Sequence, residues 1–364
     1  MRAALSAAVV VCAVTAVLPG AASASPKAGA GIATDRATTV ELITAAPDGA
    51  PANGDSTGAS ITPDGRHVVF QSGATNLASG TPSTGDAPYL RDQQSGLTKR
   101  ISSQTPLQPP TVSGDGQYAA YPLQWVRNVR VRLEQVATGS NISANCMADS
   151  CNQVSLSADG RYITLVILIK RPGLPDRQSI ELQDHLGGGG KKTVFNLGHT
   201  VPSLPSISGD GRYVAFQDGQ SRDVYLRDMV AETLAGPIEG PSVNASFVQL
   251  SDDASKIVYR VDDDTFVHDV ASGSAQLVPN VRGVAIDPTG RYLLYAPTGT
   301  TGPSSLTLRD LQTGADETVS AQPATAGVDA VSSGGHDVVF HSTSDDIAPG
   351  DTNGKSDVFV RHFS

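Results

Sequence analysis

Ser206-Ile-Ser-Gly-Asp-Gly-Arg-Tyr-Val-Ala-Phe216, followed after a short gap by Asp223-Val-Tyr-Leu-Arg-Asp228, is the stretch that decides the fold of this chain. Asp210-Gly211 predicts a tight turn between two strands, because glycine accepts the positive φ that such turns need. Tyr213 to Phe216 has the two-residue period and the aromatic and β-branched residues of a strand. The stretch therefore predicts three consecutive strands.

The same unit recurs seven times along the chain. Its turn position comes back on average every 45 residues, at Gly65, Gly116, Gly160, Gly211, Ala254, Gly290 and Gly335. After most third strands a glycine turn leads into a short fourth strand, as at Leu97 to Ile101. A period of about 40 to 45 residues with four strands per repeat is typical of a β-propeller blade. We therefore predict an all-β fold over residues 37–364, a seven-bladed β-propeller with four-stranded antiparallel blades.

The N-terminal segment supplies a strand that the last copy lacks. The seventh copy stops at Ser364, immediately after its third strand, and an isolated strand-like segment, Thr39 to Thr44, precedes the first copy. We predict that Thr39–Thr44 pairs with Val358–Arg361 and closes the ring. Such pairing also covers strand edges that would otherwise template aggregation.

The first residues have the pattern of a secretory signal peptide. Arg2 is followed by the apolar run Ala3 to Leu18 and by the small residues Ala22-Ser-Ala24. The run is shorter than the roughly 20 apolar residues that span a bilayer. We predict a signal peptide over residues 1–24, a flexible leader over 25–36, no membrane span, and a protein that is secreted or associated with the cell wall.

The net charge of the chain disfavours some classes of binding partner. The chain has a formal net charge of -10. Nucleic acids and anionic membranes both reward positive charge, so we expect neither as the main partner. We expect a monomer whose partner is a protein or an envelope glycan.

Two of the three cysteines, Cys146 and Cys151, remain after removal of the signal peptide. Export to an oxidising compartment favours a disulfide between them. Closing so short a loop contributes about 2 kcal/mol, so the bond would fix a surface loop rather than the fold. A reactive redox pair is the alternative, although four intervening residues do not match the C-x-x-C spacing.

The repeats resemble a known family. The pattern Ser-x-Asp-Gly-Arg-Tyr-Val-Ala-Phe, with Gly350-Asp-Thr-Asn-Gly-Lys-Ser-Asp-Val-Phe-Val-Arg361 in the last copy, is similar to the WD40-like β-propeller repeat of the TolB type, in particular to exported copies from actinobacteria and other bacteria. The resemblance implies a propeller over almost the whole mature chain. It implies little about function, because such propellers serve as adaptors, as lids on peptidases and in a few cases as enzymes.

No catalytic residue is predicted, and the binding residues remain unknown at this point. The Asp-Gly turns at Asp64, Asp115, Asp159 and Asp210 repeat once per blade, which is expected of a side chain that accepts backbone N–H groups in a turn. The seven histidines are scattered without zinc-type spacing. A metal-dependent lyase would need several of them to converge at one mouth of the channel.

Asp351-Thr-Asn-Gly-Lys-Ser-Asp357 has a spacing that suits a cation. Oxygen groups at Asp351, Asn353 and Asp357 around Gly354 resemble half of a calcium loop. They are our candidate Ca²⁺ ligands, and an ordinary Asx-type turn is the alternative.

Two functions are compatible with these observations. The first is a secreted, non-catalytic propeller that binds a protein or envelope partner on one rim. The second is a carbohydrate-binding or polysaccharide-degrading propeller that uses the central channel, with Trp125, Tyr89 and Tyr225 as stacking faces. Three or more His, Asp or Glu side chains that converge at one channel mouth would favour the enzyme, whereas a bare apolar or water-filled channel would favour the binding module.

Overall fold

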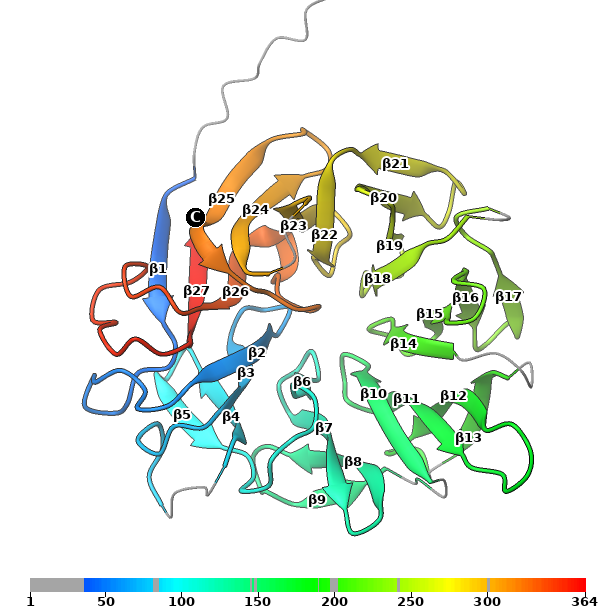
Figure 1. Cartoon of the computed structure of the whole chain (residues 1–364), viewed down its shortest axis with the longest axis horizontal. Coiled ribbons are helices and arrows are strands. Elements are labelled where there is room, and N and C mark those ends of the chain that lie inside the picture. The colour runs from blue at the N-terminus through cyan, green and yellow to red at the C-terminus, as the bar shows by residue number, and fades with distance from the viewer. Residues whose placement is uncertain are drawn as a thin grey trace, which may run out of the picture. The chain divides into compact units, whose positions relative to one another are not determined.

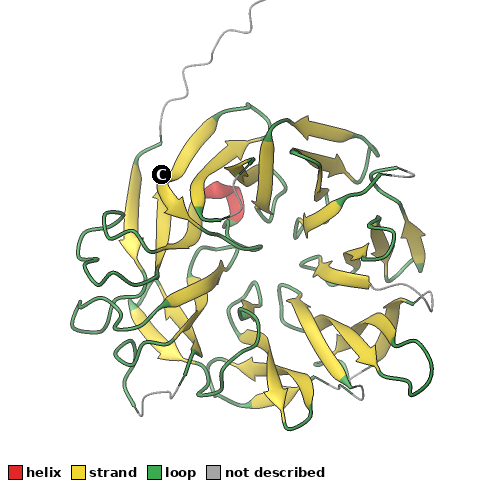
Figure 2. Cartoon of the chain, viewed as in Figure 1, coloured by secondary structure: helices red, strands yellow, loops and turns green. Residues whose placement is uncertain are grey.

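The computed structural model of the chain describes residues 36–80, 85–144, 146, 149–188, 190–196, 202–240, 243–299 and 302–364. The predicted signal peptide and all but the last residue of the predicted leader lie outside these ranges. The described part of the chain is built almost wholly of strands and loops, with one short 3-10 helix, η1 (Ser333–Gly335), as Figure 2 shows. It contains no helix that is long and apolar enough to cross a membrane.

Four sheets have four antiparallel strands each, joined in chain order. Their strands are β2 (Ser56–Ile61), β3 (His67–Ser72), β4 (Ala87–Asp92) and β5 (Leu97–Arg100); β14 (Pro202–Ile207), β15 (Tyr213–Asp218), β16 (Val224–Asp228) and β17 (Thr233–Ala235); β18 (Ser246–Leu250), β19 (Lys256–Val261), β20 (Asp264–Asp269) and β21 (Ala275–Val278); and β22 (Val281–Ile286), β23 (Tyr292–Pro297), β24 (Ser304–Asp310) and β25 (Asp316–Ala324).

The remaining strands form one sheet of eight and one of three. The larger contains β6 (Thr111–Val112), β7 (Tyr118–Trp125), β8 (Asn128–Gln135), β9 (Asn141–Ser143), β10 (Ser150–Leu156), β11 (Tyr162–Ile169), β12 (Arg177–Asp184) and β13 (Lys191–Phe195), and the smaller contains β1 (Thr38–Leu42), β26 (Asp337–Ser342) and β27 (Asp357–Phe363). Five of the six sheets therefore have at least four strands, where the sequence predicts seven separate blades. The reason is one parallel bridge, Ser150 to Val129, which joins β10 to β8.

These sheets make a β-propeller of four-stranded antiparallel blades. The first strands, β2, β6, β10, β14, β18 and β22, lie nearest the centre of the arrangement (Figure 1). Val214, Ala215 and Phe216 of β15 are all buried, although their side chains alternate between the two faces of the strand. Both faces are buried because each sheet packs against a neighbour. The two-residue alternation of this strand therefore places its side chains in two interfaces between neighbouring sheets, instead of dividing them between core and solvent.

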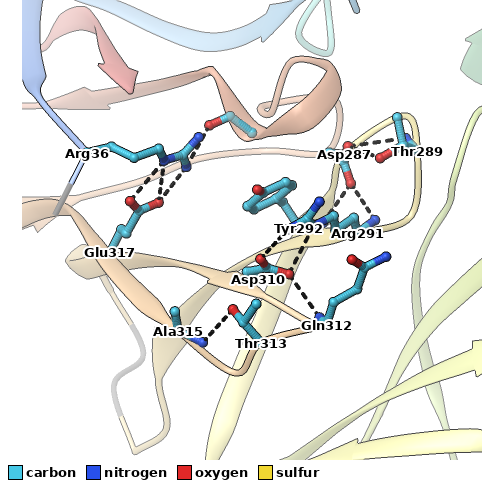
Figure 3. Close-up of polar contacts among 11 residues, drawn as sticks. Arg36, Asp287, Thr289, Arg291, Tyr292, Asp310, Gln312, Thr313, Ala315 and Glu317 are labelled. Atoms are coloured by element: carbon cyan, nitrogen blue, oxygen red, sulfur yellow. Dashed lines mark hydrogen bonds and ion pairs between the residues drawn. The ribbon is translucent and has the colours of Figure 1, made fainter. Parts of the chain in front are cut away.

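The N-terminal strand pairs with the last strand of the chain. β1 runs antiparallel to β27, with Thr39 opposite His362 and Leu42 opposite Phe359, as predicted for this segment. In Figure 1 the two strands lie side by side, β1 in blue and β27 in red. Arg36, just before β1, donates from Nε to Glu317 of β25 at 2.9 Å (Figure 3). Its guanidinium lies 4.8 Å from the ring centre of Phe363.

Turn glycines allow neighbouring copies of the repeat to approach each other closely. A β-carbon added at Gly211 would lie 2.9 Å from Cγ of Tyr162, the first residue of the second strand in the preceding copy. Gly160 faces Tyr118 in the same way, and Gly65 of the first copy faces Asp337 of the last. Since these glycines also have φ near +70°, both the turn and the close approach require glycine there.

Ion pairs join the second and third strands within a copy. Asp310 of β24 accepts from Arg291 at 2.6 Å and from the main-chain N–H of Gln312 at 2.9 Å (Figure 3). Arg212 and Asp228 pair likewise at 2.7 Å. The hydrogen bond with Arg291 lowers the pKa of Asp310 to about 2. Asp310 and Asp228, which end the third strands of their copies, therefore bond to the turn and to the arginine of their own copy.

Candidate binding site at the mouth of the central channel

The repeated Asp-Gly turns are framework. In five copies a serine or threonine hydroxyl donates to the turn aspartate, at 2.5 to 2.7 Å, in the pairs Thr62–Asp64, Ser113–Asp115, Ser157–Asp159, Ser208–Asp210 and Ser251–Asp253. The same carboxylate accepts the N–H two residues on, as from Arg212 to Asp210 at 2.9 Å. The turn interpretation of these aspartates is confirmed.

The first strands line a channel that is narrow at the Asp-Gly turns and wide at the other end. The narrow part is a cavity of about 40 Å³. The wide mouth is a cavity of about 420 Å³ whose lining includes Pro109, Pro110, Leu204, Val248 and Val328. Leu204 and Val328 are 47% and 48% exposed. The mouth therefore offers an apolar surface to a ligand.

Two aspartates, Asp252 and Asp329, line the narrow part of the channel. Asp329, at φ +56°, accepts from Nε2 of Gln249 at 2.7 Å, and Oε1 of Gln249 accepts from the N–H of Ile286 at 3.1 Å. Burial raises the pKa of Asp329 to about 6, and burial together with the nearby Asp329 raises the pKa of Asp252 to about 7. The interior of the channel is therefore weakly acidic and does not suit an anion.

Two arginines lie beside the mouth. Arg260 of β19 and Arg282 of β22 line two cavities, of about 420 and 540 Å³, that adjoin each other; the smaller shares Leu204, Val248 and Val328 with the mouth. We call these two cavities the arginine groove. The Nε atoms of both side chains are buried and make no hydrogen bond, and neither arginine has an ion-pair partner, among the described residues. Burial, and then the neighbouring Arg282, lower the pKa of Arg260.

Of the three aromatic residues predicted as stacking faces, two pack against other aromatic rings and one is exposed at the surface. Tyr89 is buried and stacks on Phe70, and its hydroxyl donates to the carbonyl of Ala74 at 3.0 Å. Tyr225 stacks on Phe216. Trp125, at the tip of the β7–β8 hairpin, is 48% exposed and is not among the residues that line the channel cavities. The proposal that Tyr89 and Tyr225 form stacking faces for a glycan is therefore wrong, since both rings are used for packing.

The histidines do not gather at the channel. None of the six that the structure describes lines either channel cavity, and His199 lies outside the described residues. His67 packs against Gly116 of the next copy, and Nδ1 of His362 lies 2.7 Å from Asp337. Across the described ranges, no group of three or more His, Cys, Asp and Glu side chains is arranged to hold a metal ion.

The remaining predicted sites lie away from the channel. Cys146 and Cys151 form a disulfide, as predicted. Asp351 and Asp357 are buried, and burial, with Asp357 and Asp345 nearby, raises the pKa of Asp351 to about 6. Asn353, the third candidate ligand, forms hydrogen bonds within the same loop. Its Oδ1 accepts from the N–H of Lys355 at 2.7 Å, which is the Asx-type turn, and its Nδ2 donates to Asp357.

The sequence could not single out the arginine groove, because its residues come from different copies. The sequence does contain a signal, which is a residue that departs from the repeat at a given position. Arg260 follows Tyr259 where the corresponding positions hold Gln71, Gln217, Ala296 and His341. Asp252 likewise replaces the Pro63, Gly114, Ala158 and Gly209 of other copies. Arg260 and Asp252 therefore stand out when the copies are aligned position by position.

No protein-family model matches the sequence, and no curated protein matches it. Solved structures do resemble the fold. Oligogalacturonate lyase from Vibrio parahaemolyticus aligns with a TM-score of 0.64 at 10% identity, over 90% of this chain and 98% of that chain. An oligogalacturonate lyase in complex with manganese gives 0.62 at 12% identity, over 91% and 98%.

A third similar structure is the β-propeller domain of Cps50 (Swd1) from Myceliophteria thermophila. It gives a TM-score of 0.51 at 12% identity, over 84% of this chain and 96% of that chain. At these identities the likeness establishes the β-propeller fold, which is common among binding modules, and does not transfer an activity.

Proposed function

We propose that the chain is an exported, non-catalytic β-propeller of seven blades, which binds a carboxylate-bearing protein partner at the arginine groove. The observation that carries this proposal is the pair Arg260 and Arg282, which line one groove and form no ion pair among the described residues, although Asp262 and Asp263 also line its larger cavity. The signal-peptide pattern over residues 1–24 and the disulfide support export.

The blade count rests on how the eight-stranded sheet is joined. Its two halves share only the bridge from Ser150 to Val129, so we divide it into two four-stranded blades. The sheet of β1, β26 and β27 is then the seventh blade. The contact of Gly65 with Asp337 continues the series of turn contacts from the last copy to the first, which supports a ring closed by β1.

The arginine pair favours an anionic ligand. Partly buried guanidinium groups are ordinarily paired with a carboxylate. The net charge of -10 means that this protein has more carboxylates than basic side chains that could pair with them. A guanidinium offers paired N–H donors that match a carboxylate. The apolar residues Leu204 and Val328 lie next to the groove. An extended peptide with an acidic residue beside an apolar one would contact both surfaces.

An acidic oligosaccharide is the second candidate ligand. The same two arginines would accept uronate carboxylates, and two of the solved structures with this fold are oligogalacturonate lyases. Such a ligand would lie along the groove, because Asp252 and Asp329 make the channel itself unfavourable for a polyanion.

Calorimetric titration tests the proposal. The mature protein is titrated with a hexapeptide of alternating Glu and Leu and, separately, with oligogalacturonate. We expect saturable binding of the peptide that weakens with salt, and at least a tenfold loss of affinity in the Arg260→Gln/Arg282→Gln variant. Arg127→Gln, an exposed arginine on the β7–β8 hairpin, is the matched control. Equal affinity in the double variant, or no binding of either probe at millimolar concentration, would contradict the proposal; cleavage of the oligosaccharide would favour the enzyme.

A further inference from the structure

The loop between β26 and β27 carries an unexplained carboxylate. Asp351 is 3% exposed, and both of its carboxylate oxygens are buried without a hydrogen-bond partner among the described residues. Buried polar groups are almost always hydrogen-bonded, and a buried charge without a partner is strongly destabilising. The side chain therefore points to a partner that binds from outside the chain.

A second buried carboxylate lies against the first. Asp357, at the start of β27, is fully buried and lies close enough to raise the pKa of Asp351, and the exposed Asp345 adds to the negative charge. Among the described residues, the hydrogen-bond donors to the Asp357 carboxylate are neutral groups, the Thr44 hydroxyl and Nδ2 of Asn353. In the described part of the chain, no lysine, arginine or histidine forms an ion pair with any of these three aspartates. Two carboxylates thus meet in a buried place that lacks a compensating cation.

We propose that Asp351 and Asp357 bind a hard divalent cation, Ca²⁺, in the β26–β27 loop. Carboxylate oxygens without nearby histidine or cysteine select such a cation over zinc or copper. Calcium tolerates irregular coordination completed by water and main-chain carbonyls, so two carboxylates can anchor it. Asn353 supports the site by donating from Nδ2 to Asp357, which orients that carboxylate.

The position of the loop gives the cation a structural task. Asn353 Nδ2 donates to the carbonyl of Ala52 at 2.8 Å, and the N–H of Ser356 donates to Asp55 at 2.9 Å. Asp357 is bonded to Thr44, which follows β1. The loop therefore connects the last blade to the segments that precede the first blade. A cation bound there would stabilise the junction between the two ends of the chain.

Thermal unfolding of the mature protein in EDTA, in 1 mM CaCl2 and in 1 mM MgCl2 tests the site. We expect calcium to raise the melting temperature by at least about 2 °C and magnesium to raise it less, because magnesium demands a more regular ligand geometry. Asp351→Asn should melt higher than the parent in EDTA, since it removes the buried charge, and should lose the response to calcium. Asp346→Asn, on the same loop and exposed, should keep the full response.

A melting temperature that calcium leaves unchanged in the parent protein would overturn the proposal, and so would an Asp351→Asn variant that keeps the whole calcium response. If that variant does not fold, calorimetric titration of the parent with CaCl2 decides the matter. One bound calcium per chain supports the site, and the absence of binding at millimolar calcium refutes it.

Discussion

Gly211→Ala should destabilise the protein through its contact with the neighbouring blade. Gly211 has φ +73°, and a left-handed conformation costs alanine about 1–2 kcal/mol. The added β-carbon would also lie 2.9 Å from Cγ of Tyr162, a ring that packs in a core cluster and cannot move aside freely. Overpacking of this kind typically costs about 1–3 kcal/mol. The free energy of unfolding should therefore fall by about 2–5 kcal/mol.

Urea unfolding followed by tryptophan fluorescence and circular dichroism measures this loss. Gly314→Ala is the matched control, because Gly314 has φ +74° and nothing within 4 Å of the β-carbon position. It should lose only the conformational cost of about 1–2 kcal/mol. Adding Tyr162→Ala to Gly211→Ala should recover part of the loss, which a double-mutant cycle reveals as coupling. Equal losses for Gly211→Ala and Gly314→Ala would refute the inter-blade contact.

Three further changes have expected outcomes. Replacing Cys146 and Cys151 by serine should cost about 2 kcal/mol in urea unfolding without changing the circular dichroism spectrum; a collapse of the spectrum would show that the bond supports the whole fold. Asp337, and then Glu41, raise the pKa of His362 to about 9, so its stabilising charge is fully present below pH 6.5 and is lost as the pH rises through 9. His362→Gln should flatten the fall in melting temperature over that range, and an unchanged profile would speak against the contact. The raised pKa of Asp252, about 7, makes the folded state bind the extra proton, so this contribution to stability is lost as the pH rises through 7. Asp252→Asn should match the parent near pH 4 and melt higher at pH 8, whereas a lower melting temperature at pH 8 would contradict the placement of Asp252 in the channel.

The framework could be predicted from the sequence because it is repeated. Each copy needs the same turn, so Asp210-Gly211 and its counterparts predict the position of each blade. The β1–β27 pairing could be predicted because the last copy lacks a fourth strand and an isolated strand precedes the first copy. The structure adds what Gly211 does between blades, since its contact with Tyr162 joins residues from two copies. No local pattern carries that information.

The candidate site could not be predicted in the same way. Arg260 and Arg282 look like ordinary surface arginines in the sequence, and their significance lies in their half-buried guanidinium groups, which form no ion pair among the described residues. The spacing identified Asp351, but it could not show that the amide oxygen of Asn353 also accepts a hydrogen bond in the turn. Spacing indicates which oxygens are available, whereas hydrogen bonds determine which of them remain free.

We infer that the chain closes on itself as one ring through its N-terminal strand. The most direct measurement is the melting temperature of the protein that lacks residues 25–46, compared with a control that lacks only residues 25–34 and keeps Arg36 and β1. Loss of β1 removes the five paired positions of the β1–β27 ladder and the fully buried Ile43. We expect the longer truncation to melt at least about 5 °C lower and the control to match the parent. Equal melting temperatures for all three proteins would contradict closure of the ring by β1.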